Sequence, residues 1–70
     1  MPDVVSDTTA VVWKILVAEG DTVEAGQEVA ILESMKMEIP VEAEVGGTVT
    51  KIHVEEGGPI AEGAPVVTLD

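Results

Sequence analysis

The sequence predicts an all-β fold, a flattened barrel or small sandwich built from two similar halves. Three observations predict it: apolar residues alternate with polar ones, most apolar residues are Val or Ile, and one segment of the chain repeats another. Period-two alternation of β-branched residues is typical of half-buried strands. Glycine-containing turns interrupt the chain too often for an amphipathic helix to form between them.

The repeat relates residues 12–33 to residues 49–70 at a constant offset of 37 residues, without a gap. Lys14, for example, corresponds to Lys51. Each copy has the pattern strand, tight turn, short strand, turn, strand. Because one copy alone is too short to bury its apolar face, we expect the two copies to pack face to face with quasi-two-fold symmetry. Residues 1–70 are therefore expected to form a single domain.

The longest apolar stretch, residues 11–18, predicts the first strand of the first copy. Because successive side chains of a strand point to opposite faces, we expect Trp13, Ile15 and Val17 to share one face. Trp13, the only aromatic residue, is expected to be partly buried in packing, with a role in docking a partner as the alternative. In the second copy the same alternation places His53 on the polar face, where a single histidine is typically a solvated side chain.

Glycines mark the turns of both copies. Four of them are related in pairs by the repeat and are expected to form turns: Gly20, Gly26, Gly57 and Gly63. A central hairpin lies between the copies, entered by residues 29–32 and left by residues 37–39. Gly46 and Gly47 break the chain before the second copy. Residues 34–47 therefore separate the two copies.

Lys36 is placed at the tip of that hairpin, within Glu33-Ser34-Met35-Lys36-Met37-Glu38. It is the one basic residue that has no partner in the repeat. Two-residue hairpin turns favour Gly or Asn because their backbone needs positive φ, yet Met35-Lys36 contains neither. A turn retained despite this local cost indicates a function at the tip.

Composition and charge exclude several classes of function. The chain has no cysteine, which excludes disulfides and cysteine-based metal sites, and His53 alone does not make a zinc site, so no metal is predicted. The net charge of −11 argues against binding to nucleic acid or anionic membranes, which need cationic patches. Neither serine has a base, and no phosphate-binding loop is present, so no enzyme is predicted. Without a signal-peptide pattern or a membrane-spanning stretch, a cytoplasmic location is expected.

The segment Glu33-Ser34-Met35-Lys36-Met37 resembles the (Ala/Ser)-Met-Lys-Met signature of biotinyl domains, the biotin carboxyl carrier family. The resemblance covers residues 11–70 and includes the four turn glycines. In particular, the chain resembles the small, free-standing biotin/lipoyl attachment proteins. The resemblance implies a barrel-sandwich hybrid of two four-stranded antiparallel sheets, with the modified lysine at a hairpin tip.

The same resemblance implies what the tip does. Lys36 would be joined to biotin through an amide made by a biotin protein ligase. The chain would then carry a carboxyl group between the biotin carboxylase and carboxyltransferase sites of a biotin-dependent carboxylase, as a non-catalytic subunit or domain that is monomeric when isolated. The residues expected to be recognised by the ligase and these subunits are Glu33, Ser34, Met35, Met37 and Glu38.

Two alternatives remain open. Lipoyl domains share the fold but usually have Asp before the lysine, where this chain has Met35, so biotin is favoured over a lipoyl or other acyl group. The other alternative is an unmodified binding or regulatory module. The stretch Asp7-Thr8-Thr9-Ala10 departs from the family pattern, which leaves the path of residues 1–10 open. The sequence does not identify the acceptor that such a carboxylase would use.

Overall fold

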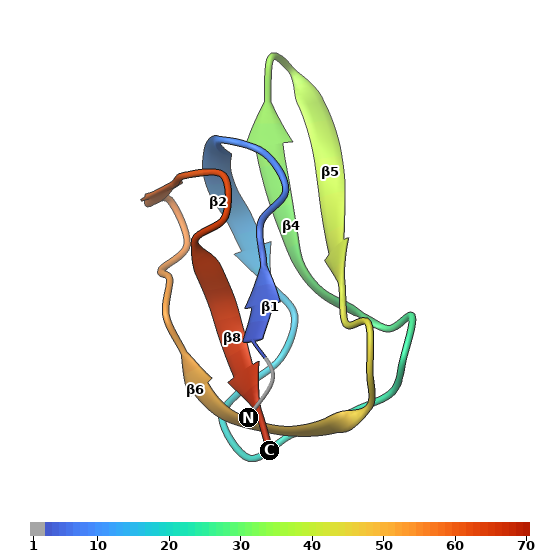
Figure 1. Ribbon diagram of the computed structural model, residues 1–70. Helices are drawn as coiled ribbons and strands as arrows, with labels where there is room; N and C mark the ends of the chain where they lie inside the picture. The colour runs from blue at the N-terminus through green and yellow to red at the C-terminus, as the bar shows by residue number, and fades with distance from the viewer. Residues whose placement is uncertain (1–2) are drawn as a thin grey trace.

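The described residues, 3–70, form two four-stranded antiparallel sheets in the computed structural model (Figure 1). One sheet has the strand order β1-β8-β6-β3 and the other β5-β4-β2-β7. The strands are β1 (Asp3–Val5), β2 (Ala10–Ile15), β3 (Thr22–Val23), β4 (Glu28–Ser34), β5 (Met37–Glu42), β6 (Gly47–Ile52), β7 (Pro59–Ile60) and β8 (Pro65–Leu69). The predicted all-β fold of two four-stranded sheets is confirmed. No helix in this part of the chain has the length and apolarity needed to cross a membrane.

The core lies between the sheets and consists of aliphatic side chains at alternating strand positions. Val12, Leu32, Val49 and Leu69 are almost completely buried. Each sheet therefore has one inner, apolar face, as the period-two pattern predicted. Burying one such side chain contributes about 1.5–3 kcal/mol. In a chain of this size without disulfides, this core is the main source of stability.

The two halves have the same strand register at the offset of 37 residues. Strand β2 pairs with β4, and the register shifts between Val12 and Lys14. Strand β6 pairs with β8, and its register shifts between Val49 and Lys51. A β-bulge inserts one extra residue into a strand, so each half carries a bulge at the same place.

The turns interlock the two halves. All four predicted turn glycines have positive φ: Gly20 (96°), Gly26 (85°), Gly57 (86°) and Gly63 (84°). The N–H of Gly20 donates to the carbonyl oxygen of Val49, and the N–H of Gly57 donates to that of Val12, both at 2.7 Å. A turn of each half is thus bonded to a strand of the other, which ties the halves into one structure.

The structural equivalence begins earlier than the sequence repeat. Val4 on β1 and Val41 on β5 occupy equivalent register positions against β8 and β4. Strand β1 is therefore the counterpart of the end of β5, and residues 3–10 follow the path of their counterparts; residues 1 and 2 lie outside the described part. Within that part only residues 34–39 lack a counterpart, a shorter segment than the 34–47 expected. The sequence alone does not reveal this equivalence, because β1 and β5 share the alternation of apolar and polar residues but few identical residues.

The bulge in β2 corrects the expected position of Trp13. Its side chain is 45% exposed, whereas Val17 is buried and Ile15 packs against the core. Because the bulge adds a residue, Trp13 and Lys14 both point outward and the alternation resumes at Ile15. Nζ of Lys14 lies 5.4 Å from the centroid of the Trp13 ring, a cation–π contact on the outer surface. The expectation that Trp13 shares a face with Ile15 and Val17 is therefore wrong.

Candidate functional site

The hairpin between β4 and β5 extends beyond the core (Figure 1). Its last core residues are Leu32, which is fully buried, and the paired Ile39, which packs against the core. Two further cross-strand pairs continue to the turn, Glu33 with Glu38 and Ser34 with Met37. Ile39 thus anchors the base of the hairpin.

Met35 and Lys36 form the turn itself. Their φ angles are 51° and 66°, and two consecutive residues with positive φ define the type I′ hairpin turn. The left-handed conformation costs roughly 1–2 kcal/mol for each residue that carries an ordinary side chain. The positive φ angles that the sequence predicted at this tip are confirmed, and they fall on the two residues of the motif.

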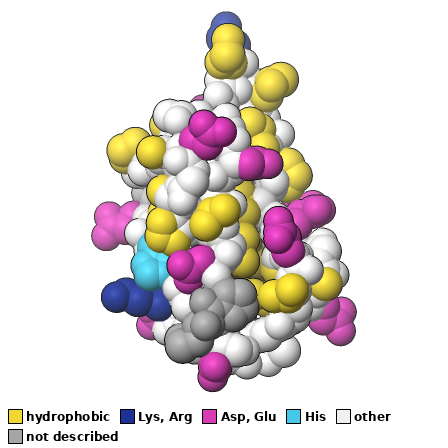
Figure 2. Space-filling view, in the orientation of Figure 1, with side chains coloured by type: hydrophobic (Ala, Val, Ile, Leu, Met, Phe, Trp, Pro, Cys, Tyr) yellow, Lys and Arg dark blue, Asp and Glu magenta, His cyan; other side chains and the backbone are white. Residues whose placement is uncertain are grey.

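The side chains at the tip combine apolar groups with a basic one, and all are exposed. Figure 2 shows a basic side chain beside hydrophobic ones at the end of the hairpin. Met35 is 91% exposed and Met37 is 60% exposed, and Lys36 is exposed as well. Exposed methionines adapt to irregular partner surfaces because their side chains are flexible and polarisable. Met37 therefore does not act as core packing.

Two carboxylates stand directly opposite each other below the tip. Glu33 and Glu38 are exposed cross-strand partners, and like charges in that arrangement destabilise a hairpin. Ser34 lies between them and the turn and is half-buried. Neither carboxylate contributes to the core, so the structure gives the pair no stabilising role.

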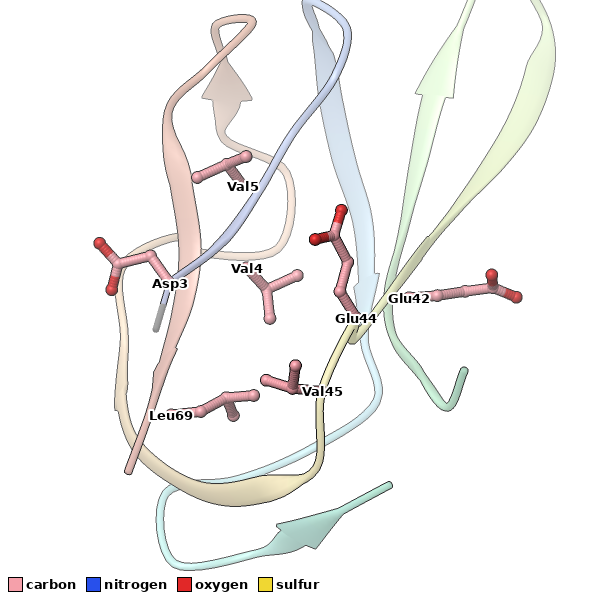
Figure 3. A pocket seen from close by; sticks show the side chains of 7 residues that line it. All are labelled: Asp3, Val4, Val5, Glu42, Glu44, Val45 and Leu69. Carbon is pink, nitrogen blue, oxygen red and sulfur yellow. The ribbon is translucent and has the colours of Figure 1, made fainter. Parts of the chain in front are cut away.

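The surface hollows lie away from the tip. A cavity of about 130 Å³ is lined by Asp3, Val4, Val5, Glu42, Glu44, Val45 and Leu69 (Figure 3). In this view Val4, Val45 and Leu69 fill its interior, while the carboxylate of Glu42 points away. Small-molecule sites usually have roughly 300–1,000 Å³. A broader depression of about 520 Å³ adjoins it along β5, and neither hollow is lined by Met35, Lys36 or Met37.

The other candidate groups of the sequence are held in local hydrogen bonds. A ring nitrogen of exposed His53 lies 2.6 Å from Oγ1 of Thr68, which donates to Oδ1 of Asp3 at 2.7 Å. Buried Ser6 donates to the backbone of Thr8. Across residues 3–70, no group of three or more His, Cys, Asp or Glu side chains is arranged to hold a metal ion.

The tip therefore offers a single reactive group, the primary amine of Lys36, on an exposed and defined turn. The C-terminus lies at the opposite end of the molecule from the hairpin (Figure 1). An amine presented in this way is accessible to an acylating enzyme and, afterwards, to a distant active site. The arrangement suits a residue that other proteins modify and use.

Comparisons with known proteins agree with this geometry. A family model described as biotin-requiring enzyme matches residues 1–69. The biotin/lipoyl attachment protein of Bacillus subtilis is 51% identical over 57 residues, which cover 81% of this chain and 78% of that protein. The biotinylated protein TB7.3 homolog of Mycobacterium leprae is 46% identical over 67 residues, covering 96% of this chain and 94% of that one.

A solved structure shows the same fold inside a larger protein. The crystal structure of the Kluyveromyces lactis urea carboxylase matches with a TM-score of 0.92 at 38% identity, over 99% of this chain but only 6% of that chain. The resemblance found in the sequence is confirmed at the level of both sequence and fold. This chain belongs to the biotin/lipoyl attachment family, the family of biotin carboxyl carrier domains.

Proposed function

We propose that the chain is a biotin carboxyl carrier in which Lys36 is the attachment residue. The observation that carries the proposal is the strained type I′ turn, which holds an exposed lysine between two exposed methionines. No core packing accounts for these residues, which supports a role in contacts with another protein. Relatives named as biotin carboxyl carrier proteins support the assignment.

Each residue of the tip has its own proposed role. A biotin protein ligase would make biotinyl-adenylate from biotin and ATP, with release of diphosphate. The amine of Lys36 would then attack its carbonyl carbon, which forms the amide, releases AMP and a proton, and removes the charge of the lysine. Met35 and Met37 supply adaptable apolar contacts to the ligase and later to the carboxylase sites. Ser34, Glu33 and Glu38 complete the recognised segment. When attached, biotin supplies the ureido nitrogen that accepts and releases a carboxyl group.

The partners proposed for this carrier are the ligase and the biotin carboxylase and carboxyltransferase subunits of a biotin-dependent carboxylase. Relatives that form part of such enzymes, among them the alpha3 subunit of a biotin-dependent acyl-coenzyme A carboxylase in Mycobacterium leprae, support this choice. The chain itself would be non-catalytic, cytoplasmic and monomeric. Its role would be to move between sites, with the chemistry of the acceptor set by the carboxyltransferase.

Lipoate is the alternative modification of the same lysine. Met35 before the lysine favours biotin, because lipoyl domains resembling this fold usually have Asp there. A Met35→Asp variant separates the two: it should lower the rate of modification by a biotin protein ligase. An unmodified binding module would instead tolerate the loss of Lys36 without loss of function.

The test is the intact mass of the protein after incubation with a biotin protein ligase, ATP and biotin. The parent should gain the mass of one biotinyl amide, and Lys36→Ala and Lys36→Arg should gain none. Lys14→Arg and Lys51→Arg are matched controls, because each removes an exposed amine elsewhere, and both should be modified like the parent. A gain that survives Lys36→Arg would refute the site, and no gain on the parent would refute the carrier function.

A further inference from the structure

The internal symmetry gives each outer surface residue of one sheet a counterpart on the other sheet. The outer faces of the two sheets can therefore be compared position by position, because their strands have the same geometry and register. On the sheet β5-β4-β2-β7, six outward positions are occupied by Val11, Trp13, Leu16, Ile31, Pro40 and Pro59. Their counterparts on the sheet β1-β8-β6-β3 are Thr48, Thr50, His53, Thr68, Asp3 and Thr22. At these six positions every residue of the first face is apolar and every residue of the second is polar. Elsewhere the outer faces are mixed: the first also carries Lys14, Glu33 and Glu38, and the second carries Val5, which is 48% exposed.

The six apolar residues, called the apolar face below, point away from the core. Val11 lies beside the fully buried Val12, and Ile31 lies between the fully buried Ala30 and Leu32. Alternation along the strands thus directs Val11 and Ile31 outward. Val11 is 44% exposed and Leu16 and Trp13 are each 45% exposed, whereas Ile31 is half-buried.

The apolar face extends across all four strands of the sheet, and charged residues lie within it, because Val11 pairs with Glu33 and Ile31 pairs with Lys14. Pro59 pairs with Val11 on one side of β2, and on the other side Ile31 pairs with both Lys14 of β2 and Pro40 of β5. The bulge turns Trp13 outward next to Lys14, where regular alternation would have directed it inward. Exposed apolar residues gathered on one face indicate a site of interaction. An exposed Trp among them, here with Nζ of Lys14 5.4 Å from its ring centroid, is typical of a binding hot spot.

The fold does not need this face to be apolar. The counterpart face has the same strands and the same bulge, yet it carries threonines, a histidine and an aspartate. Threonine is as suitable for a strand as valine or isoleucine, so folding alone does not select the apolar residues. Hydrogen bonds within the chain account for part of the polar face, because Oγ1 of Thr68 joins His53 to Asp3. The exposure of Val11 and Trp13 on the other face is what favours a partner outside the chain.

The apolar face is joined to the lysine hairpin. Strands β4 and β5 contribute Ile31 and Pro40 to the face and continue directly into the turn that carries Lys36. Between the face and the turn stands the opposed pair Glu33 and Glu38, with Glu33 also paired to Val11. A partner that covers the apolar face and reaches Lys36 would therefore also contact these two negative charges.

Charge decides between the possible occupants. A second copy of the chain would bring another net charge of −11 and a second Glu33–Glu38 pair, and like charges brought together across an interface disfavour association. A partner with basic side chains beside an apolar patch would neutralise the pair and cover Trp13. The complementary partner is thus a basic-rimmed protein surface rather than another copy.

We propose that the apolar face docks the chain onto the catalytic subunits of a biotin-dependent carboxylase, through an apolar patch bordered by basic side chains. This inference rests on the proposed carrier function. Docking by the face leaves the hairpin free to extend past the contact, so that Lys36 enters the active site while the body of the domain is held outside. Glu33 and Glu38 then set the orientation through the basic side chains of the partner.

The test replaces the apolar face with its own polar counterpart. The variant Val11→Thr, Trp13→Thr and Ile31→Thr copies the residues found at Thr48, Thr50 and Thr68, so strand propensity is preserved. The matched control, Thr22→Val with Thr48→Val, makes the opposite face more apolar. Thermal unfolding establishes that each variant is folded, and intact mass establishes that each is biotinylated.

Two measurements follow on biotinylated protein, one with the biotin carboxylase subunit and one with the carboxyltransferase subunit. With the carrier as the varied substrate, the triple variant should raise KM about tenfold or more for at least one subunit and leave kcat unchanged. The control should keep the parent KM. In addition, 5-fluorotryptophan incorporated into the chain gives one ¹⁹F resonance, from Trp13, which should shift or broaden when that subunit is added.

The outcomes separate the docking inference from the carrier function. An unchanged KM with both subunits, on biotinylated variant protein, would overturn the docking face and leave the carrier function standing. If light scattering showed a dimer for the parent and a monomer for the triple variant, the docking proposal would also be overturned, because a second copy of the chain would then cover the apolar face. A parent that accepts no biotin would overturn both proposals.

Discussion

Replacing Met35-Lys36 with Asn-Gly is expected to stabilise the domain while removing its reactive amine. The two residues adopt φ of 51° and 66°, a conformation that costs roughly 1–2 kcal/mol per ordinary residue. Asn reduces this cost and Gly abolishes it, whereas Gly loses about 0.5–1 kcal/mol through the entropy of the unfolded chain. Met35 is 91% exposed, so little burial is lost. The net expected gain is about 1–2 kcal/mol.

Urea unfolding measures this gain. With a slope of about 1 kcal/mol per molar urea for a small domain, the midpoint should rise by about 1–2 M, and the melting temperature by about 4–8 °C for each kcal/mol. The control is Met35→Ala with Lys36→Ala, which retains Cβ atoms and thus the strain. Its stability should lie within about 0.5 kcal/mol of the parent.

An Asn-Gly variant no more stable than the parent and the alanine control would contradict this explanation. The turn would then carry no strain, and strain would no longer indicate a function at the tip. A stabilised variant would show that the hairpin accepts a stability cost in order to present Lys36. Natural proteins commonly keep such strain at functional sites.

Further predictions concern the core, a close approach and the charge. Leu32→Ala and Leu69→Ala remove equivalent, fully buried side chains and should each lower the free energy of unfolding by about 2–5 kcal/mol; urea titrations that differ by more than about 2 kcal/mol would contradict the equivalence of the halves. Gly47→Ala would place a Cβ 2.8 Å from the carbonyl oxygen of Asp70, and the resulting shift should cost about 1–3 kcal/mol, which the same titration checks. Added NaCl should raise the melting temperature of the parent, because it screens the repulsion within a net charge of −11; a temperature independent of salt would mean that this repulsion is negligible.

Local residue patterns were sufficient to predict several features of this protein. Alternating Val and Ile predicted strands, because only one face of each strand meets the core. The glycine pairs predicted the turns, and the absence of Gly and Asn in Met35-Lys36 predicted strain at the tip. The motif around Lys36 predicted the family. Each of these inferences depends on residues that are neighbours in the sequence, where periodicity and backbone preference act directly.

Pairing between distant strands determines where the alternation slips and which surfaces remain uncovered. The bulge in β2 turns Trp13 outward, and a bulge depends on the pairing with β4, which the sequence of β2 does not contain. The partnership of β1 with β8 joins opposite ends of the chain, so no local pattern reveals that β1 is the counterpart of β5. The contrast between the two outer faces is likewise visible only in the assembled sheets. The sequence alone does not distinguish an apolar residue that is exposed from one that is buried.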